Sequence, residues 1–154
     1  MKRETKTQIY TLIVLFLFVG SGLAYAVAYV LPLPKPAEGI YVFDVPLSDA
    51  QEGYFIEQNK VVMKYFYSPT CLACRDMESI IEEVIEHLKE NLITEKINIK
   101  EYSEVMSWFD IKTTPSFILK GKTIERYEDM LTKDELLNKI CALYFEEIDE
   151  CTLS

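Results

Sequence analysis

Two cysteines, Cys71 and Cys74, stand directly between a buried-strand pattern and an amphipathic-helix pattern. The strand pattern is KVVMKYFY at residues 60–67, which is almost continuously apolar and is bounded by Asn59 and Ser68-Pro69. Such a run is typical of a strand whose two faces are both covered. Beyond the cysteines, apolar side chains recur at helical spacing: Met77, Ile80, Ile81, Val84, Ile85, Leu88 and Leu92. The chain is therefore predicted to place both cysteines where a central strand passes into a helix.

The rest of the domain predicts an alternating α/β fold. Acidic side chains are expected on the solvent face of the helix after the cysteines: Glu78, Glu82, Glu83 and Glu86. The other expected elements are a strand at 40–43, a helix at 47–58, a strand at 96–100, a helix at 103–109 capped by Ser103, and a hairpin of strands 116–120 and 123–127. The Thr132–Glu135 capping box then opens a last helix. This alternation requires a sheet with helices on both faces.

An apolar segment precedes this domain. Residues 9–31 read IYTLIVLFLFVGSGLAYAVAYVL, and no charged residue occurs from Thr7 to Pro34. Since roughly 20 helical residues cross the hydrocarbon core of a bilayer, the segment is predicted to be one transmembrane anchor. A cleavable signal peptide ending near Ala24-Tyr25-Ala26 is the alternative, although apolar residues continue past that point.

Charge and proline positions predict how the chain is arranged around that anchor. The chain has 16 basic and 25 acidic residues, and three of the basic residues but only one acidic residue lie within the first six positions. Because positive charge beside a membrane span stays on the cytoplasmic side, residues 1–8 are expected in the cytoplasm and the domain outside it. The prolines of LPLPKP predict an extended stalk at 32–39, followed by the domain at 40–154. The remaining net charge of −11 makes nucleic acid an improbable partner.

The position of the cysteines suits thiol–disulfide exchange, which needs an attacking thiolate and a second thiol that resolves the mixed disulfide. At a helix N-terminus, free backbone N–H groups and the helix dipole stabilise a thiolate. We therefore expect Cys71 to be the nucleophile and Cys74, one turn further on, to be the resolving thiol. Thr114-Pro115, just before the strand-like SFILK, predicts a turn in which a cis peptide bond is one possibility.

The segments KYFYSPTCLACRDM and WFDIKTTPSFILKGKTIERY, followed by a C-terminal helix, resemble the thioredoxin family over about residues 40–144. The combination of Cys-x-x-Cys, a Thr-Pro roughly forty residues later, a hairpin and a helix is more specific than the cysteines alone. The resemblance implies the thioredoxin fold, a central mixed sheet with helices on both faces. It also implies that Pro115 is cis and faces the cysteines, and that Thr114 binds the backbone of a protein substrate.

Several positions depart from the family pattern. Tyr65 stands six residues before the first cysteine, where cytoplasmic thioredoxins carry a buried aspartate, so the resemblance implies no carboxylate proton relay there. Thr70 replaces the usual tryptophan, and Leu72-Ala73 replaces both the Gly-Pro of that family and the Pro-His of strong periplasmic oxidants. A glycine usual after the hairpin is absent near Glu128-Asp129. These differences leave the direction of electron flow open.

Other interpretations of the cysteines are an inert bridge or half of a zinc site. Zinc needs four ligands, whereas Cys141 and Cys151 are ten residues apart and His87 is expected on the solvated face of its helix, so no metal site is predicted. By elimination, Cys141 and Cys151 are expected to form a structural disulfide. A second redox pair and a free buried thiol at Cys141 are the alternatives.

These observations predict a membrane-anchored, extracytoplasmic thiol–disulfide oxidoreductase that acts on cysteine-containing protein clients. No cofactor is expected beyond the Cys71–Cys74 disulfide, and a membrane redox partner is expected to reset it. Met106, Trp108 and Phe109 are expected mainly in the core, with one or two at the apolar rim of the substrate site. The alternatives are a dedicated reductant for cytochrome or metallochaperone maturation, and a redox-inert binding or scaffold module with the same fold.

Overall fold

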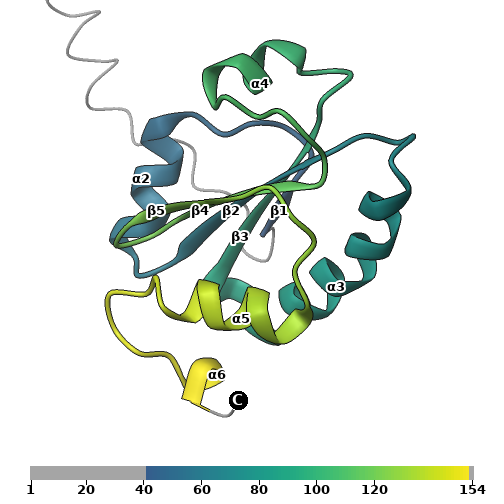
Figure 1. Ribbon diagram of the computed structural model, residues 1–154. Helices are drawn as coiled ribbons and strands as arrows, with labels where there is room; N and C mark the ends of the chain where they lie inside the picture. Colours follow the sequence, from purple (N-terminus) through teal and green to yellow (C-terminus); the bar gives the residue numbers. More distant parts are fainter. Residues whose placement is uncertain (1–40, 153–154) are drawn as a thin grey trace, which may run out of the picture. The chain divides into compact units, whose positions relative to one another are not determined.

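The computed structural model describes residues 41–152, in which one five-stranded sheet has the order β1-β3-β2-β4-β5 (Figure 1). The strands are β1 (Val42–Phe43), β2 (Val61–Tyr67), β3 (Leu92–Asn98), β4 (Ser116–Lys120) and β5 (Ile124–Tyr127). β3 runs parallel to β1 and β2, whereas β4 runs antiparallel to β2 and β5. The predicted mixed sheet is therefore confirmed.

Helices cover both faces of this sheet, as Figure 1 shows. Those in the described part of the chain are α2 (Asp49–Glu57), α3 (Leu72–Leu88), α4 (Ser103–Trp108), α5 (Lys133–Cys141) and α6 (Asp149–Thr152). Alternate side chains of β2 point to opposite faces. Val61, Met63 and Tyr65 pack in the same cluster as α3 and α5, whereas Phe66 packs with α4. β2 is buried on both faces because helices lie over both.

The helix after the cysteines ends earlier than its apolar spacing predicts. α3 stops at Leu88, because Lys89 adopts a left-handed backbone (φ 48°) and residues 89–91 form a 3₁₀ turn. Leu92 is not helical but begins β3, where it lies opposite Val61 in the parallel register. The strand predicted at 96–100 therefore begins four residues earlier. An apolar residue at position 92 fits both the helical spacing of α3 and the pattern of a buried strand. Its pairing with Val61 of β2 makes it part of the strand.

The helix caps agree with the sequence in one case and not in another. Thr132 and Glu135 form the predicted capping box, in which the Glu135 N–H donates to Thr132 Oγ1 (3.3 Å) and the Thr132 N–H donates to Glu135 Oε2 (2.9 Å). The predicted cap at Ser103 is wrong. α4 begins at Ser103 itself, and the preceding Tyr102 occupies the cap position without a side-chain hydrogen bond.

The three predicted N-terminal segments lie outside the described residues, namely the basic segment 1–8, the membrane anchor 9–31 and the stalk 32–39. Within residues 41–152, no helix has the length and apolar character needed to cross a bilayer.

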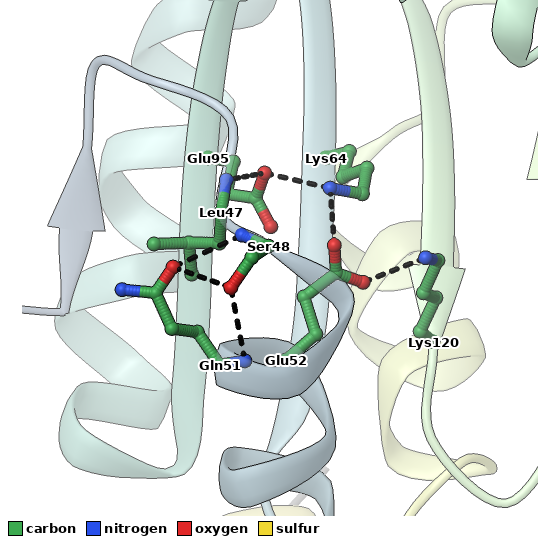
Figure 2. A network of polar contacts seen from close by, with 7 residues as sticks. All are labelled: Leu47, Ser48, Gln51, Glu52, Lys64, Glu95 and Lys120. Atoms are coloured by element: carbon green, nitrogen blue, oxygen red, sulfur yellow. Dashed lines mark hydrogen bonds and ion pairs between the residues drawn. The ribbon is translucent and has the colours of Figure 1, made fainter. Parts of the chain in front are cut away.

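A network of charged side chains is buried between α2 and the sheet (Figure 2). Lys64 on β2 contacts Glu95 of β3 and Glu52 of α2, each at 2.7 Å, and Glu52 also contacts Lys120 of β4 at 2.6 Å. The Lys64, Glu52 and Glu95 side chains are at most 3% exposed. Phe109 closes the network, since its ring centroid lies 5.3 Å from the Lys64 ammonium and 5.4 Å from that of Lys120.

Opposite charges balance in this network, which joins two lysines to two glutamates. Burial raises the pKa of Glu95, and the Lys64 ammonium opposes that rise. The Leu47 backbone N–H also donates to Glu95 Oε2 (3.0 Å), which ties the segment before α2 to the sheet. A buried charge that loses its partner is strongly destabilising, so the four side chains depend on one another.

We expect Lys64→Met to lower the free energy of unfolding by about 3–5 kcal/mol, because it leaves Glu95 buried without its ammonium partner. The loss should grow as the pH rises above about 4.5, the ordinary pKa of a glutamate, because Glu95 must then hold a proton that the unfolded chain releases. Urea titrations between pH 4 and 8 measure both effects.

The matched control is Lys133→Met, which removes an ion pair with Glu83 at 3.0 Å between side chains that are 43% and 59% exposed. Its expected effect is below about 1 kcal/mol and nearly independent of pH. Equal effects of the two substitutions would contradict the account of the buried network.

Candidate active site

Cys71 lies at the junction of β2 and α3. Its backbone is extended (φ −84°, ψ 117°), its N–H donates to the Ser68 carbonyl oxygen (3.0 Å), and its Sγ accepts a hydrogen bond from the Cys74 N–H (3.0 Å). Cys71 is thus the N-cap of α3, a helix of 17 residues. Helix N-terminal N–H groups stabilise an anion, so this position favours a thiolate on Cys71.

Cys74 lies in the first turn of α3 and forms a disulfide with Cys71, with 5.2 Å between the Cα atoms. The two residues differ in accessibility. Cys71 is partly exposed, whereas Cys74 is 4% exposed. An incoming disulfide can therefore reach the sulfur of Cys71 more readily than that of Cys74.

Thr114 and Pro115 lie beside this disulfide, although they are more than forty residues away in the chain. The Thr114–Pro115 peptide bond is cis, and the Thr114 carbonyl oxygen is 3.5 Å from Cys71 Sγ. The antiparallel pairing of Phe66 with Ser116 brings the two segments together, because it sets the end of β2 against the start of β4. The turn is held by the Ser116 hydroxyl, which donates to the Thr113 carbonyl oxygen (2.6 Å).

Tyr65 supports the first turn of α3 from below. Its hydroxyl donates to the Cys74 carbonyl oxygen (3.0 Å), and its ring stacks on Phe117 and Tyr67 with centroid distances of 5.2 and 5.6 Å. Burial raises the pKa of Tyr65, and the negative charge of Glu78 adds to the rise. Tyr65 therefore stays neutral and acts as a hydrogen-bond donor to the helix that carries Cys74, a contact that the sequence did not predict.

An open pocket of about 510 Å³ lies against Cys74. Its lining residues are Asp44, Tyr67, Ser68, Pro69, Cys74, Arg75, Glu78 and Lys96. Glu78 forms an ion pair with Lys96 of β3 and keeps 38% of its side chain exposed, so it lies at the border between the expected solvent face of the helix and the sheet. The sequence did carry a signal, because Glu78 follows Cys74 by four residues and the two share a helix face.

The three large side chains at residues 106, 108 and 109 differ in burial. Met106 and Phe109 pack against the core, as was expected for most of the three, whereas Trp108 is 71% exposed. Within residues 41–152, no group of three or more His, Cys, Asp or Glu side chains is arranged to hold a metal ion.

The second cysteine pair lies at the other end of α3. Cys141 and Cys151 form a disulfide with 5.6 Å between their Cα atoms, which ties α6 to the end of α5. His87 was expected to be solvated, but its Nε2 lies 2.9 Å from the Glu150 carbonyl oxygen and fastens α6 to α3. Because a helix rises about 1.5 Å per residue, His87 is roughly 24 Å along α3 from Cys71. The two disulfides are therefore too far apart for direct exchange.

We expect the double variant Cys141→Ser, Cys151→Ser to lower the free energy of unfolding by about 2–4 kcal/mol, because the cross-link no longer restricts the unfolded chain. Its rate of exchange with a disulfide reporter should stay within about twofold of the parent rate, since the site at Cys71 is remote. Denaturant titration and reporter kinetics on the same preparation measure both. A folded variant that has lost exchange would instead mark this pair as part of the redox chemistry.

Comparison with known proteins supports the assignment suggested by the fold. A family model described as thioredoxin matches residues 46–142, more than half of the chain. Thioredoxin Y1 of Arabidopsis thaliana, a chloroplast protein, is 31% identical over 94 residues, covering 60% of this chain and 55% of that protein. A thioredoxin of Alicyclobacillus acidocaldarius is 29% identical over 92 residues, covering 58% of this chain and 88% of that thioredoxin. The chain spans about half the length of the chloroplast relatives it matches.

Solved structures share the fold at low sequence identity. A thioredoxin variant from Halobacterium salinarum superposes with a TM-score of 0.58 at 21% identity, covering 73% of this chain and 98% of that one. Chloroplastic thioredoxin z gives 0.54 at 19% identity, covering 63% and 90%. These two likenesses establish the fold alone, and the family model establishes the relationship. The chain belongs to the thioredoxin family, whose members are thiol–disulfide oxidoreductases.

Proposed function

We propose that this protein exchanges disulfides with cysteine-containing protein clients, with Cys71 as the nucleophile and Cys74 as the resolving thiol. The observation that carries the proposal is the position of the Cys71 sulfur. It accepts a hydrogen bond from a helix N-terminal N–H at 3.0 Å and lies 3.5 Å from the Thr114 carbonyl oxygen. One residue thus combines a stabilised thiolate, partial exposure and a neighbouring backbone on which an extended client can lie.

The reaction takes two exchanges. In the reduced protein the Cys71 thiolate attacks one sulfur of a client disulfide, and the other client sulfur leaves as a thiolate. Cys74 then attacks the Cys71 sulfur of the mixed disulfide, which releases the second client thiolate and forms the Cys71–Cys74 disulfide. Run in reverse, the same steps oxidise a client dithiol. No external cofactor takes part in either direction.

Substrate binding at Thr114 is part of this proposal. Backbone pairing with Thr114 would hold a client strand beside Cys71 whatever its side chains are, since backbone groups carry no sequence information. Leu72, which follows Cys71 directly and is 70% exposed, offers an apolar contact next to the reacting sulfur. A site of this kind suits protein clients better than small disulfides.

We also propose that the domain works outside the cytoplasm, tethered by residues 9–31, with a membrane redox partner that resets Cys71 and Cys74. The basic residues before the apolar segment support this orientation. A second disulfide between Cys141 and Cys151, remote from the first, suits an oxidising compartment, where structural disulfides persist.

Trapping of mixed disulfides tests the exchange reaction. In cells that produce the full chain, Cys74→Ala should accumulate reducible cross-linked species, because the first exchange proceeds and nothing resolves it. Cys71→Ala should accumulate none, and it is the matched control because it removes the partner of the same disulfide. Separation by non-reducing electrophoresis followed by mass spectrometry identifies the clients. Equal patterns for the two variants would favour a redox-inert scaffold.

Labelling of intact cells tests the location. After mild reduction, a membrane-impermeant maleimide should modify the cysteines of the full chain without lysis, and the mass of the purified protein should include residues 9–31. Modification only after lysis would overturn the extracytoplasmic placement. A mass that corresponds to a chain starting near residue 27 would instead identify a cleaved signal peptide.

A further inference from the structure

The resolving step needs a proton acceptor, which Cys71, Cys74 and Thr114 do not provide. Cys74 reacts only as a thiolate, yet it is 4% exposed, and burial in apolar surroundings disfavours the thiolate. A proton acceptor must therefore serve Cys74 when it attacks the mixed disulfide. The Tyr65 hydroxyl contacts the backbone of Cys74, but it is already a donor to the Cys74 carbonyl oxygen, and burial raises its pKa, so it cannot take the proton.

The pocket beside Cys74 contains two carboxylates, Glu78 and Asp44. Glu78 is the better placed. It lies one helical turn after Cys74, and residues four apart on a helix have Cβ atoms roughly 5–6 Å apart. Its charge also acts on both Tyr65 and Tyr67, which places the carboxylate over the end of β2. The charge of Asp44 acts on Tyr67 as well, but Asp44 belongs to the exposed segment that follows β1, and no ion pair within residues 41–152 fixes its carboxylate.

Lys96 fixes the Glu78 carboxylate in this place. The ion pair joins α3 to β3, and the Lys96 side chain is 17% exposed against 38% for Glu78. Lys96 lies opposite Tyr65 in the parallel register of β2 and β3, so its ammonium reaches the pocket from the sheet. Glu78 thus lines the same pocket as Cys74 and is also accessible to water, as a group that transfers protons must be.

From this geometry we infer that Glu78 is the proton acceptor for Cys74, with Lys96 as its positioning residue, an inference that rests on the proposed disulfide exchange. The Cys74 proton passes to the Glu78 carboxylate, directly or through water in the pocket, as the Cys74 sulfur forms its bond to Cys71. The Cys71–client bond breaks, and its electron pair leaves on the client sulfur. Glu78 then releases the proton to solvent. In the oxidising direction it returns a proton to Cys74.

Several other charged or titratable groups lie around this carboxylate and contribute to the pH dependence. They are Tyr65 and Tyr67 on β2, Lys96 on β3, Arg75 and Glu82 on α3, Asp44 after β1, and Glu101 after β3. Of these, Asp44 is the only other carboxylate that lines the pocket among the described residues, so it provides the matched control.

A two-phase kinetic experiment separates the two exchanges. The full chain, reduced and kept in mild detergent, is mixed with a disulfide peptide made of two different halves, and samples stopped with acid at millisecond intervals are separated to quantify each released half. Attack by Cys71 releases the first half, and resolution by Cys74 releases the half held on Cys71. At pH 7 we expect Glu78→Gln to slow the second phase at least about 10-fold and to change the first by less than about twofold. Asp44→Asn should change neither phase.

The pH profile distinguishes proton transfer from a structural role. Without its acceptor, only the fraction of Cys74 that ionises unaided reacts, so the second phase of Glu78→Gln should rise about tenfold per pH unit. Glu78→Asp keeps the carboxylate and should restore part of the rate. Cys74→Ala should show the first phase alone, with or without Glu78→Gln. Circular dichroism confirms that each variant is folded.

Other outcomes overturn the inference in distinguishable ways. An unchanged second phase in Glu78→Gln removes Glu78 from the reaction, and an equal slowing of both phases makes its role structural. A loss on Asp44→Asn assigns the proton to the other carboxylate. If the unaltered chain shows no first phase, the proposed disulfide exchange itself fails, and the role of Glu78 fails with it.

Discussion

The pairing of β2 with both of its neighbours is the constraint on which the rest of the structure depends. Its parallel pairing with β3 and antiparallel pairing with β4 bury the strand on both edges, while helices bury both faces. The end of β2 is then fixed beside the start of β4, and the Cys71 sulfur lies 3.5 Å from the Thr114 carbonyl oxygen as a result. A register shift in the pairing of β2 with β4 would separate the cysteines from the Thr114-Pro115 turn.

The same pairing places charge on both faces of the sheet. In successive positions of the parallel register, Lys64 lies opposite Glu95 and Tyr65 lies opposite Lys96. Because adjacent residues in a strand point to opposite faces, Glu95 joins the buried network under α2, whereas Lys96 meets Glu78 beside Cys74. The first network is closed and acts on stability. The second opens to solvent through a pocket, which is where proton exchange with water can occur.

The sequence predicts the helices and strands well, but it predicts poorly which side chains from distant parts of the chain contact one another. Local signals fix the end of β2, the helix after Cys71 and the capping box at Thr132, because each depends on residues a few positions apart. The partners of Lys64 lie 12 and 31 residues away, so no local pattern reveals them. Helical periodicity likewise shows which side of α3 carries Glu78 but not that β3 presents Lys96 to it. The cis bond at Pro115 was expected only through the family resemblance.

Redox titration of the full chain against a thiol buffer, with the state of each cysteine read by alkylation and mass spectrometry, tests the central claim most directly. We predict that Cys71 and Cys74 exchange together as one two-electron couple, with a midpoint between roughly −270 and −120 mV, the values of a family reductant and a strong oxidant. Cys141 and Cys151 should stay joined until below about −300 mV, as structural disulfides do. If Cys71 and Cys74 instead remain in one state across that window, the protein does not exchange disulfides and the fold serves binding alone.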